Sequence, residues 1–337
     1  MKITIYFGTG GVGKTSVAAA TALARAHAGA KCLVLTTDPA LRLRTAFGLK
    51  HGIAEHRVAL GSAGRGELWA AQLDVRVTLD QAVRQYAVPR DRDRILGHSI
   101  YGTIAESLSG MQELMTLERI DQLRRRGFEN IVIDTAPSRR AIEMLNKPVL
   151  FAEFAGSNWV KLMGRTYKFA EGLGMMAMGR KTLDTYTRVE SMLGAKLVRE
   201  VIDFYSLFVP VAEAFALRAQ RTVALLKDPA VTDFRMVSTP HKARRDARFF
   251  SKALQDRGLR LSRVMVNRVW DREPVATRLA GTAGEALEWY GCVRAGQASE
   301  ISLLREEQSD VRILAELDRD VDGLDALEGL AGQLAGE

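Results

Sequence analysis

The stretch Gly8-Thr9-Gly10-Gly11-Val12-Gly13-Lys14-Thr15 follows the apolar run Ile3–Phe7 and precedes the small-residue run Ser16–Ala20. It fits the pattern G-x-x-x-x-G-K-[ST] in the strand–loop–helix setting that this pattern requires. In such a loop, backbone N–H groups and the helix N-terminus face phosphate oxygens, the lysine reaches the β- and γ-phosphates, and the next hydroxyl is offered to Mg²⁺. The stretch therefore predicts a triphosphate-binding loop whose contacts are Gly8, Gly10, Gly11, Val12, Gly13, Lys14, Thr15 and Ser16.

Two aspartates that follow apolar runs extend the predicted site. Asp134 comes directly after Ile131–Ile133, where a carboxylate can hold Mg²⁺ through a water molecule. Asp38 comes directly after Cys32–Thr37, where a switch loop would lie beside the γ-phosphate and a carboxylate can position or deprotonate the attacking water. We expect Lys14, Asp38 and Asp134 to be catalytic, and Thr15, Asp38 and Asp134 to hold the metal. A helix cap at Asp134 and an Asp-Pro turn at Asp38 are the alternatives.

Short, continuous apolar runs alternate with helical patterns along the chain. Continuous runs indicate strands that are buried on both faces, and their alternation with helices indicates a parallel sheet covered on both sides. The sequence therefore predicts an α/β fold with a mostly parallel sheet. The predicted strands are Ile3–Phe7, Cys32–Thr37, Leu68–Leu73, Ile131–Ile133, Met236–Ser238, Val264–Val269 and Val311–Leu314.

About 100 residues between Ile133 and Met236 contain no convincing strand. Apolar residues there recur at helical spacing, which predicts helices. We expect a helical insertion over 149–228, with a second helical stretch at about 79–126 packing beside it. Residues 1–148 and 229–337 then form the sheet domain.

Composition excludes several classes of protein. Hydrophobic residues make up 47% and charged residues 26% of the 337 residues, which excludes disorder as the main state. The two cysteines, Cys32 and Cys292, can form neither a disulfide framework nor a Cys-x-x-Cys site, which indicates a reducing compartment. Because no motif for nucleic acid accompanies the net charge of +8, no nucleic-acid partner is expected.

A dinucleotide enzyme is a rival interpretation of the same glycines. Residues 8–13 also fit G-x-G-x-x-G, and Asp38 lies where such a fold holds a ribose. The Lys14-Thr15 pair and the second acidic strand end at Asp134 favour a triphosphate with Mg²⁺ instead. A nicotinamide oxidoreductase is kept as the remote alternative.

Together, the glycine-rich loop, Thr37-Asp38-Pro39-Ala40 with Phe47-Gly48, and Asp134-Thr135-Ala136-Pro137 resemble the ArsA-type ATPases, which are related to MinD. The resemblance extends over the whole chain, through Ser238-Thr239-Pro240 and Val266-Asn267-Arg268. It implies an Mg²⁺-dependent ATPase that opens and closes as a dimer, in the cytoplasm. It also implies that Asn267 reads adenine; the alternative is that Asn267 caps a turn. Because position 270 is Trp, a guanine-type Asn-Lys-x-Asp is not matched, so ATP is preferred.

The chain departs from this family at three places. Thr9 stands where the family's loop has a lysine that crosses the dimer to the partner's phosphates. Arg139 and Arg140 follow the Asp-Thr-Ala-Pro motif where the pump ATPases have Gly-His, and we hypothesise that one of them supplies the missing positive charge. A solvated basic helix start is the alternative for this pair. The family's arsenite-binding cysteines and zinc-clamping Cys-x-x-Cys are absent, so arsenite transport is not expected.

The predicted insertion contains four methionines within Leu162–Met178, interleaved with glycines and flanked by basic residues. Flexible methionines can line an adaptable groove, so this segment is a candidate site for a hydrophobic protein client or a membrane surface. Core filling or a dimer contact is the alternative. The sequence thus predicts a homo- or heterodimeric ATP-driven switch with such a client. A weakly hydrolysing scaffold subunit of a heteromeric complex is the second hypothesis.

Overall fold

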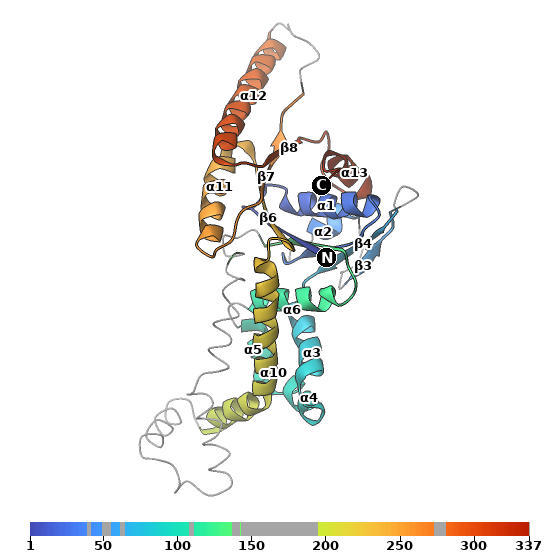
Figure 1. Ribbon diagram of the computed structural model, residues 1–337, viewed down its shortest axis with the longest axis vertical. Coiled ribbons are helices and arrows are strands. Elements are labelled where there is room, and N and C mark those ends of the chain that lie inside the picture. Colours follow the sequence, from blue (N-terminus) through green and yellow to red (C-terminus); the bar gives the residue numbers. More distant parts are fainter. Residues whose placement is uncertain are drawn as a thin grey trace, which may run out of the picture. The chain divides into compact units, whose positions relative to one another are not determined.

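The computed structural model describes residues 1–38, 42–48, 55–60, 65–107, 111–136, 142, 195–272 and 281–336. The chain forms two compact units (Figure 1). The first contains residues 1–73, 123–142 and 225–337, and the second contains residues 74–122 and 143–224. The predicted methionine segment, Arg139 and Arg140 lie outside the described residues.

The first unit is built on a sheet of eight strands in the order β3-β4-β2-β5-β1-β6-β7-β8. All neighbouring pairs are parallel except β3 with β4. The α/β fold with a mostly parallel sheet is therefore confirmed. The strands are β1 (Lys2–Phe7), β2 (Lys31–Thr36), β3 (His56–Val58), β4 (Glu67–Gln72), β5 (Asn130–Asp134), β6 (Thr232–Ser238), β7 (Arg263–Val269) and β8 (Val311–Ala315).

Helices cover both faces of this sheet, and adjacent residues of β1 show the two sides. The Tyr6 hydroxyl lies 2.7 Å from Thr21 Oγ1 of α1 (Lys14–His27), whereas the Phe7 ring stacks on Phe250 of α11 (Pro240–Gln255). Side chains alternate between faces along a strand, so α1 and α11 lie on opposite sides. On the α1 side, α13 (Leu324–Gln333) packs against α1 (Figure 1). The short α2 (Arg42–Ala46) also contacts α1.

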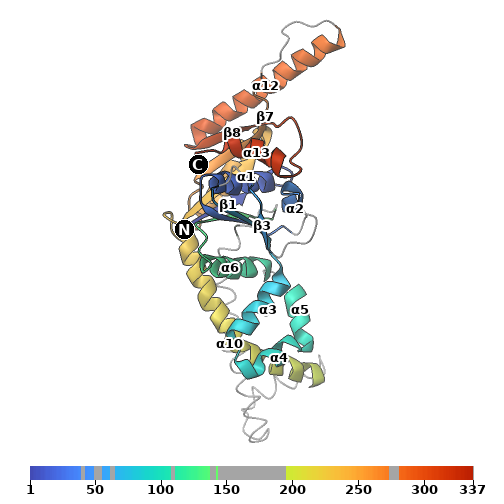
Figure 2. The same ribbon diagram turned by 90° about the vertical axis from the view of Figure 1, so that its right-hand side faces the viewer.

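The long α12 (Thr282–Glu307) packs on α11. Its buried residues are Gln297, Ile301 and Leu304, all in its C-terminal half. The half that begins at Thr282 extends away from the strands (Figure 2). Trp289 in that half is 61% exposed.

The second unit is helical over its described residues. Three side-chain contacts join elements that are far apart in the sequence: Tyr86 contacts the Phe215 ring edge to face at 5.7 Å and donates to Glu118 Oε1 at 2.5 Å, and Arg218 pairs with Asp121 at 2.9 Å. The elements are α3 (Val75–Tyr86), the 3₁₀ turn η2 (Pro89–Asp91), α4 (Arg92–Leu96), α5 (Ser99–Ser107), most of α6 (Met111–Arg124) and most of α10 (Ala195–Lys227). No helix among the described residues is long and apolar enough to cross a bilayer.

The predicted strands differ from the observed ones mainly at their ends. The second strand ends at Thr36, so Asp38 lies two residues beyond it. The sixth strand begins four residues earlier than predicted, at Thr232. The sequence did not predict β3, because a three-residue edge strand that begins with the exposed His56 and Arg57 has no apolar run.

Candidate functional site

The predicted triphosphate loop lies at the carboxyl end of β1, directly before α1. Gly13 is the residue before the helix and has a φ of 83°, in the left-handed region that glycine adopts without strain. A Cβ atom there would lie 2.3 Å from Asn267 Nδ2. The sequence therefore needs glycine at this position both for the backbone turn and for the close approach of β7.

The loop borders a pocket of about 510 Å³. Its lining includes Gly11, Val12, Gly13, Lys14, Thr15 and Ser16, as the motif predicts. The other lining residues are Thr9, Arg42, Thr45, Arg268 and Val321, none of which was predicted to contact phosphate. Residues 11–16 of the loop, Arg42 and Arg268 thus line the same cavity.

Asp134 is at the centre of the polar contacts below the loop. Its Oδ2 accepts hydrogen bonds from Thr15 Oγ1 at 2.7 Å and from Thr36 Oγ1 at 3.0 Å. Its Oδ1 lies 3.6 Å from Lys14 Nζ and accepts no hydrogen bond from any described residue. The structure therefore brings Lys14, Thr15 and Asp134 together, although they come from two different strand–loop junctions.

Burial sets the electrostatics of this pair, since Asp134 is fully buried and Lys14 is 4% exposed. Desolvation raises the pKa of Asp134 above its usual range, while the charge of Lys14 and the two threonine hydroxyls oppose this rise. Desolvation likewise lowers the pKa of Lys14, against the attraction of Asp134 and Asp38. Both groups are thus held in a dry site where a further charged ligand would interact strongly.

Asp38 is buried near the same site. Its backbone N–H donates to Thr36 Oγ1 at 3.1 Å, and its Oδ2 lies 3.7 Å from Arg42 Nη1. Thr36 thus connects the two aspartates, because its hydroxyl donates to Asp134 and accepts from the Asp38 backbone. Residues 39–41 lie outside the described residues, so the rest of the predicted switch loop is not placed.

Asn267 supports the loop from β7. It is buried, and its Nδ2 donates to Val12 O at 3.0 Å. The next residue, Arg268, lies in a β-bulge and has a φ of 62°, an uncommon conformation for a residue other than glycine. The structure therefore holds Asn267 against the loop and places Arg268 in the lining of the pocket.

Thr9 makes a contact that the sequence did not predict. Its hydroxyl donates to Asp246 Oδ2 of α11 at 3.3 Å, and Ser238 at the end of β6 donates to the same oxygen at 2.9 Å. Asp246 is buried and belongs to a helix with many basic residues, so its sequence context gave no sign of a role. Position 9 is therefore connected to α11 of the same chain.

The fit of Mg²⁺ can be judged from the donor set. A buried carboxylate with an oxygen that accepts no hydrogen bond from the described residues, beside a threonine hydroxyl at a helix start, matches the hard oxygen ligands that Mg²⁺ prefers. Among the described residues no group of three or more His, Cys, Asp or Glu side chains forms a metal cluster. The site thus fits a metal bound by one or two protein groups together with phosphate oxygens and water.

The fold and this loop define a P-loop nucleoside-triphosphate-binding protein, with the phosphate loop between the first strand and first helix of a parallel sheet. The model of the anion-transporting ATPase family matches residues 1–336, so the chain belongs to the ArsA-type ATPase family.

Curated relatives carry the same family name or a related one. The chain is 33% identical over 153 residues to a putative arsenical pump-driving ATPase of Chlorobaculum tepidum, covering 44% of this chain and 36% of that protein. It is 26% identical over 190 residues to the ATPase get3 of Schizosaccharomyces pombe, covering 55% of each. It is 29% identical over 201 residues to the arsenical pump-driving ATPase of Escherichia coli, covering 58% of this chain and 33% of that protein. The chain thus spans about a third to a half of the length of these relatives.

Proposed function

We propose that this protein is an Mg²⁺-dependent ATPase. The observation that supports it most strongly is the buried cluster of Lys14, Thr15 and Asp134 directly below the phosphate loop, in which Asp134 Oδ1 faces the lysine ammonium at 3.6 Å. Such a cluster has an evident use only when phosphate and a cation enter the site. Each of the three relatives reported above is named as an ATPase, which supports the same conclusion.

Each side chain has a part in phosphoryl transfer. The loop N–H groups and Lys14 bind the phosphates and neutralise their charge. Thr15 and Asp134 would hold Mg²⁺, which when bound offsets the charge on the β- and γ-phosphate oxygens. Asp38, which comes after β2 beside this cluster, positions the attacking water and accepts its proton. The reaction is otherwise a matter of positioning and charge, so these few groups suffice.

Asn267 and Arg268 would complete the nucleotide site. We assign adenine recognition to Asn267, which directly precedes the pocket-lining Arg268 and whose amide also supports the loop. Arg42 and Arg268 line the same pocket and supply positive charge. They join Arg139 and Arg140 as candidates for the charge that the family's lysine supplies and Thr9 does not.

We further propose that the protein works as a dimer that ATP closes and hydrolysis opens, in the cytoplasm, with the sheet residues 1–148 and 229–337 as the motor and the insertion 149–228 as the client-binding part. The membership of the family and the likeness to get3 support the dimer. A hydrophobic protein or a membrane-associated protein is the proposed client, and peripheral contact with a membrane would follow from such a client.

The dimer is tested by light scattering after size exclusion, using an Asp38→Asn variant that binds ATP without consuming it. We expect twice the monomer mass both with ATP and Mg²⁺ and with ADP, because the dimer opens without separating, and a smaller hydrodynamic radius with ATP. A monomer under both conditions, with ATP binding verified by calorimetry, contradicts the dimer. Affinity capture with the same variant, with and without ATP, would then identify the client.

A weakly hydrolysing, ATP-binding scaffold subunit of a heteromeric complex is the second candidate. The observation that favours it is at Thr9. Its neutral hydroxyl donates to Asp246 of its own chain, so position 9 supplies no positive charge to the phosphates of a partner. The two candidates differ in turnover: a scaffold predicts a rate that substitution of Asp38 does not change.

A further inference from the structure

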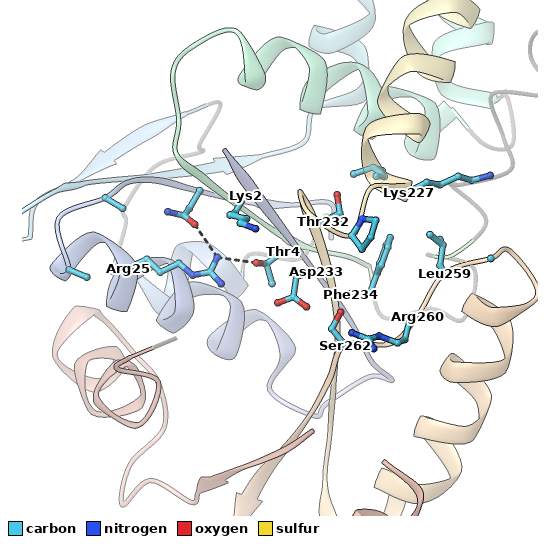
Figure 3. Close-up of a pocket in the computed structure, with 16 residues that line it drawn as sticks. Lys2, Thr4, Arg25, Lys227, Thr232, Asp233, Phe234, Leu259, Arg260 and Ser262 are labelled. Carbon is cyan, nitrogen blue, oxygen red and sulfur yellow. Dashed lines mark hydrogen bonds between the residues drawn. The ribbon is translucent and has the colours of Figure 1, made fainter. Parts of the chain in front are cut away.

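A second cavity lies far from the phosphate loop. It has a volume of about 1020 Å³, and all of its lining residues belong to the first unit (Figure 3). They come from the amino ends of β1, β5 and β6, the C-terminal part of α1, the segment before β7 and the end of α10. The phosphate loop lies at the opposite end of β1, about 20 Å away at ~3.3 Å per residue. The cavity is therefore separate from the nucleotide site.

Positive charge predominates in the lining of this cavity. Lys2, Arg25, Lys227 and Arg260 line it, together with one carboxylate, Asp233 (Figure 3). That carboxylate accepts a hydrogen bond from Arg235 Nε at 2.5 Å, so it is already engaged by a cation that is not part of the lining. The lining thus has more positive charge than its own acidic group can balance.

Arg25 shows this excess most clearly. Its Nη1 donates to Thr4 Oγ1 at 2.9 Å and to Asn130 Oδ1 at 3.4 Å, both of them neutral oxygens (Figure 3). Within the described part of the chain, no carboxylate forms an ion pair with it at 4 Å or less. Burial, and next the charge of Arg235, lower its pKa below the usual value for arginine. A partly buried guanidinium held in place by neutral groups, beside a second guanidinium, is prepared for an anion.

The large apolar residues of the cavity lie on the side away from Arg25. Leu226, Pro229, Phe234 and Leu259 line it, and Figure 3 shows Phe234 and Leu259 on the side away from Arg25. Small-molecule sites typically have volumes of roughly 300 to 1,000 Å³ and join apolar walls to a few fixed polar groups. A cavity of this size and polarity matches a ligand with an acidic head and an apolar body.

We propose that this cavity is a second ligand site, which binds an amphipathic organic anion, with its carboxylate or phosphate head on Arg25 and its apolar body against Phe234 and Leu259. The head accepts hydrogen bonds from guanidinium N–H groups that neutral oxygens now only partly satisfy. The apolar body gains binding free energy from burial, at roughly 25 cal/mol per Å². This site is independent of the proposed ATPase activity.

Calorimetric titration of the full chain with dodecanoate, below its micellar concentration, tests the site. We expect one molecule bound per chain, with affinity at least about tenfold weaker in Arg25→Gln and weaker by a smaller factor in Arg260→Ala, whose charge lies farther from the head. Arg257→Ala is the matched control: Arg257 belongs to the same segment but does not line the cavity, so its substitution leaves the affinity unchanged. Thermal melts of each variant exclude loss of folding as the cause of weaker binding.

Two further probes separate the head from the body. Dodecyl phosphate is expected to bind like dodecanoate, whereas dodecyltrimethylammonium, with the same tail and opposite charge, and inorganic phosphate, with no tail, are expected to bind at least tenfold more weakly. The proposal is overturned if dodecanoate does not bind, if the cationic amphiphile or inorganic phosphate binds equally well, or if neither arginine substitution weakens binding. Titration in the presence of ATP keeps this result separate from the nucleotide site.

Discussion

Gly8, the first residue of the phosphate loop, lies against the backbone of β6. A Cβ atom at this position would be 2.4 Å from Val237 O, a contact that only a shift of backbone could relieve. We expect Gly8→Ala to lower the free energy of unfolding by about 1–3 kcal/mol and to weaken ATP binding, because the loop has to move.

Gly332→Ala in α13 is the control for Gly8→Ala. A Cβ there would have no atom within 4 Å, and alanine favours a helix by about 1 kcal/mol. Chemical denaturation of both variants checks the difference. Equal free energies of unfolding in the two variants would contradict the close packing of the loop on β6.

The two cysteines differ in environment, and their reactivity should differ accordingly. Cys32 in β2 is buried, and desolvation raises its pKa to about 12, whereas Cys292 in α12 is exposed. The thiolate is the reactive form, and with such a pKa about one Cys32 in 10⁴ is ionised at pH 8. A colorimetric disulfide reagent should therefore titrate one thiol per native chain at pH 8, and two in denaturant.

Raising the pH towards 12 increases the ionised fraction of Cys32, so its reaction should accelerate tenfold per pH unit while the fold persists. In Cys292→Ser the rapid reaction should disappear. Two rapidly reacting thiols in the native wild-type chain would show that the core around β2 is open to solvent.

Sequence patterns located the residues of the site that belong to contiguous motifs. Lys14 and Thr15 follow from the loop pattern alone, and Asp134 from its place after an apolar strand. Arg42, Arg268 and Asp246 could not be found in this way, because each reaches the loop only through the packing of separate elements. Arg139 and Arg140 stay predictions, as does the role of Asp38 as the base.

At the scale of elements, the parallel strands were predictable because burial on both faces makes them continuous apolar runs. The edge strand β3 has one polar side and three residues, so its pattern is indistinguishable from a loop. The connection of the phosphate loop to α11 could not be predicted from the sequence either. It depends on one buried carboxylate, Asp246, that receives hydrogen bonds from both Ser238 and Thr9.

This connection predicts an energetic coupling between Thr9 and Asp246. Asp246→Ala should lower the free energy of unfolding by about 1–3 kcal/mol, because Ser238 and Thr9 lose a charged acceptor. In a double-mutant cycle with Thr9→Ala, denaturation should give a coupling of about 1 kcal/mol between the two positions. Strictly additive losses would mean that the 3.3 Å contact has no energetic weight.

At the scale of the whole molecule, the chain combines a sheet unit that contains the phosphate loop with a helical unit whose described elements pack around Tyr86 and Phe215. The sequence predicted a helical insertion over 149–228 because apolar residues recur there at helical spacing, and a second helical stretch at about 79–126 beside it. The methionine segment, where a client is proposed to bind, lies outside the described residues. The proposed function as an ATP-driven switch therefore depends first on the chemistry at the phosphate loop.

Steady-state ATP hydrolysis by the full chain tests that chemistry most directly, measured for the wild type, Asp38→Asn and the exposed control Asp256→Asn. We predict Mg²⁺-dependent turnover that Asp38→Asn lowers by about 10²-fold or more, with ATP affinity retained and the control unchanged, as expected for loss of a general base. No turnover in the wild type, or equal turnover in Asp38→Asn, would contradict the account.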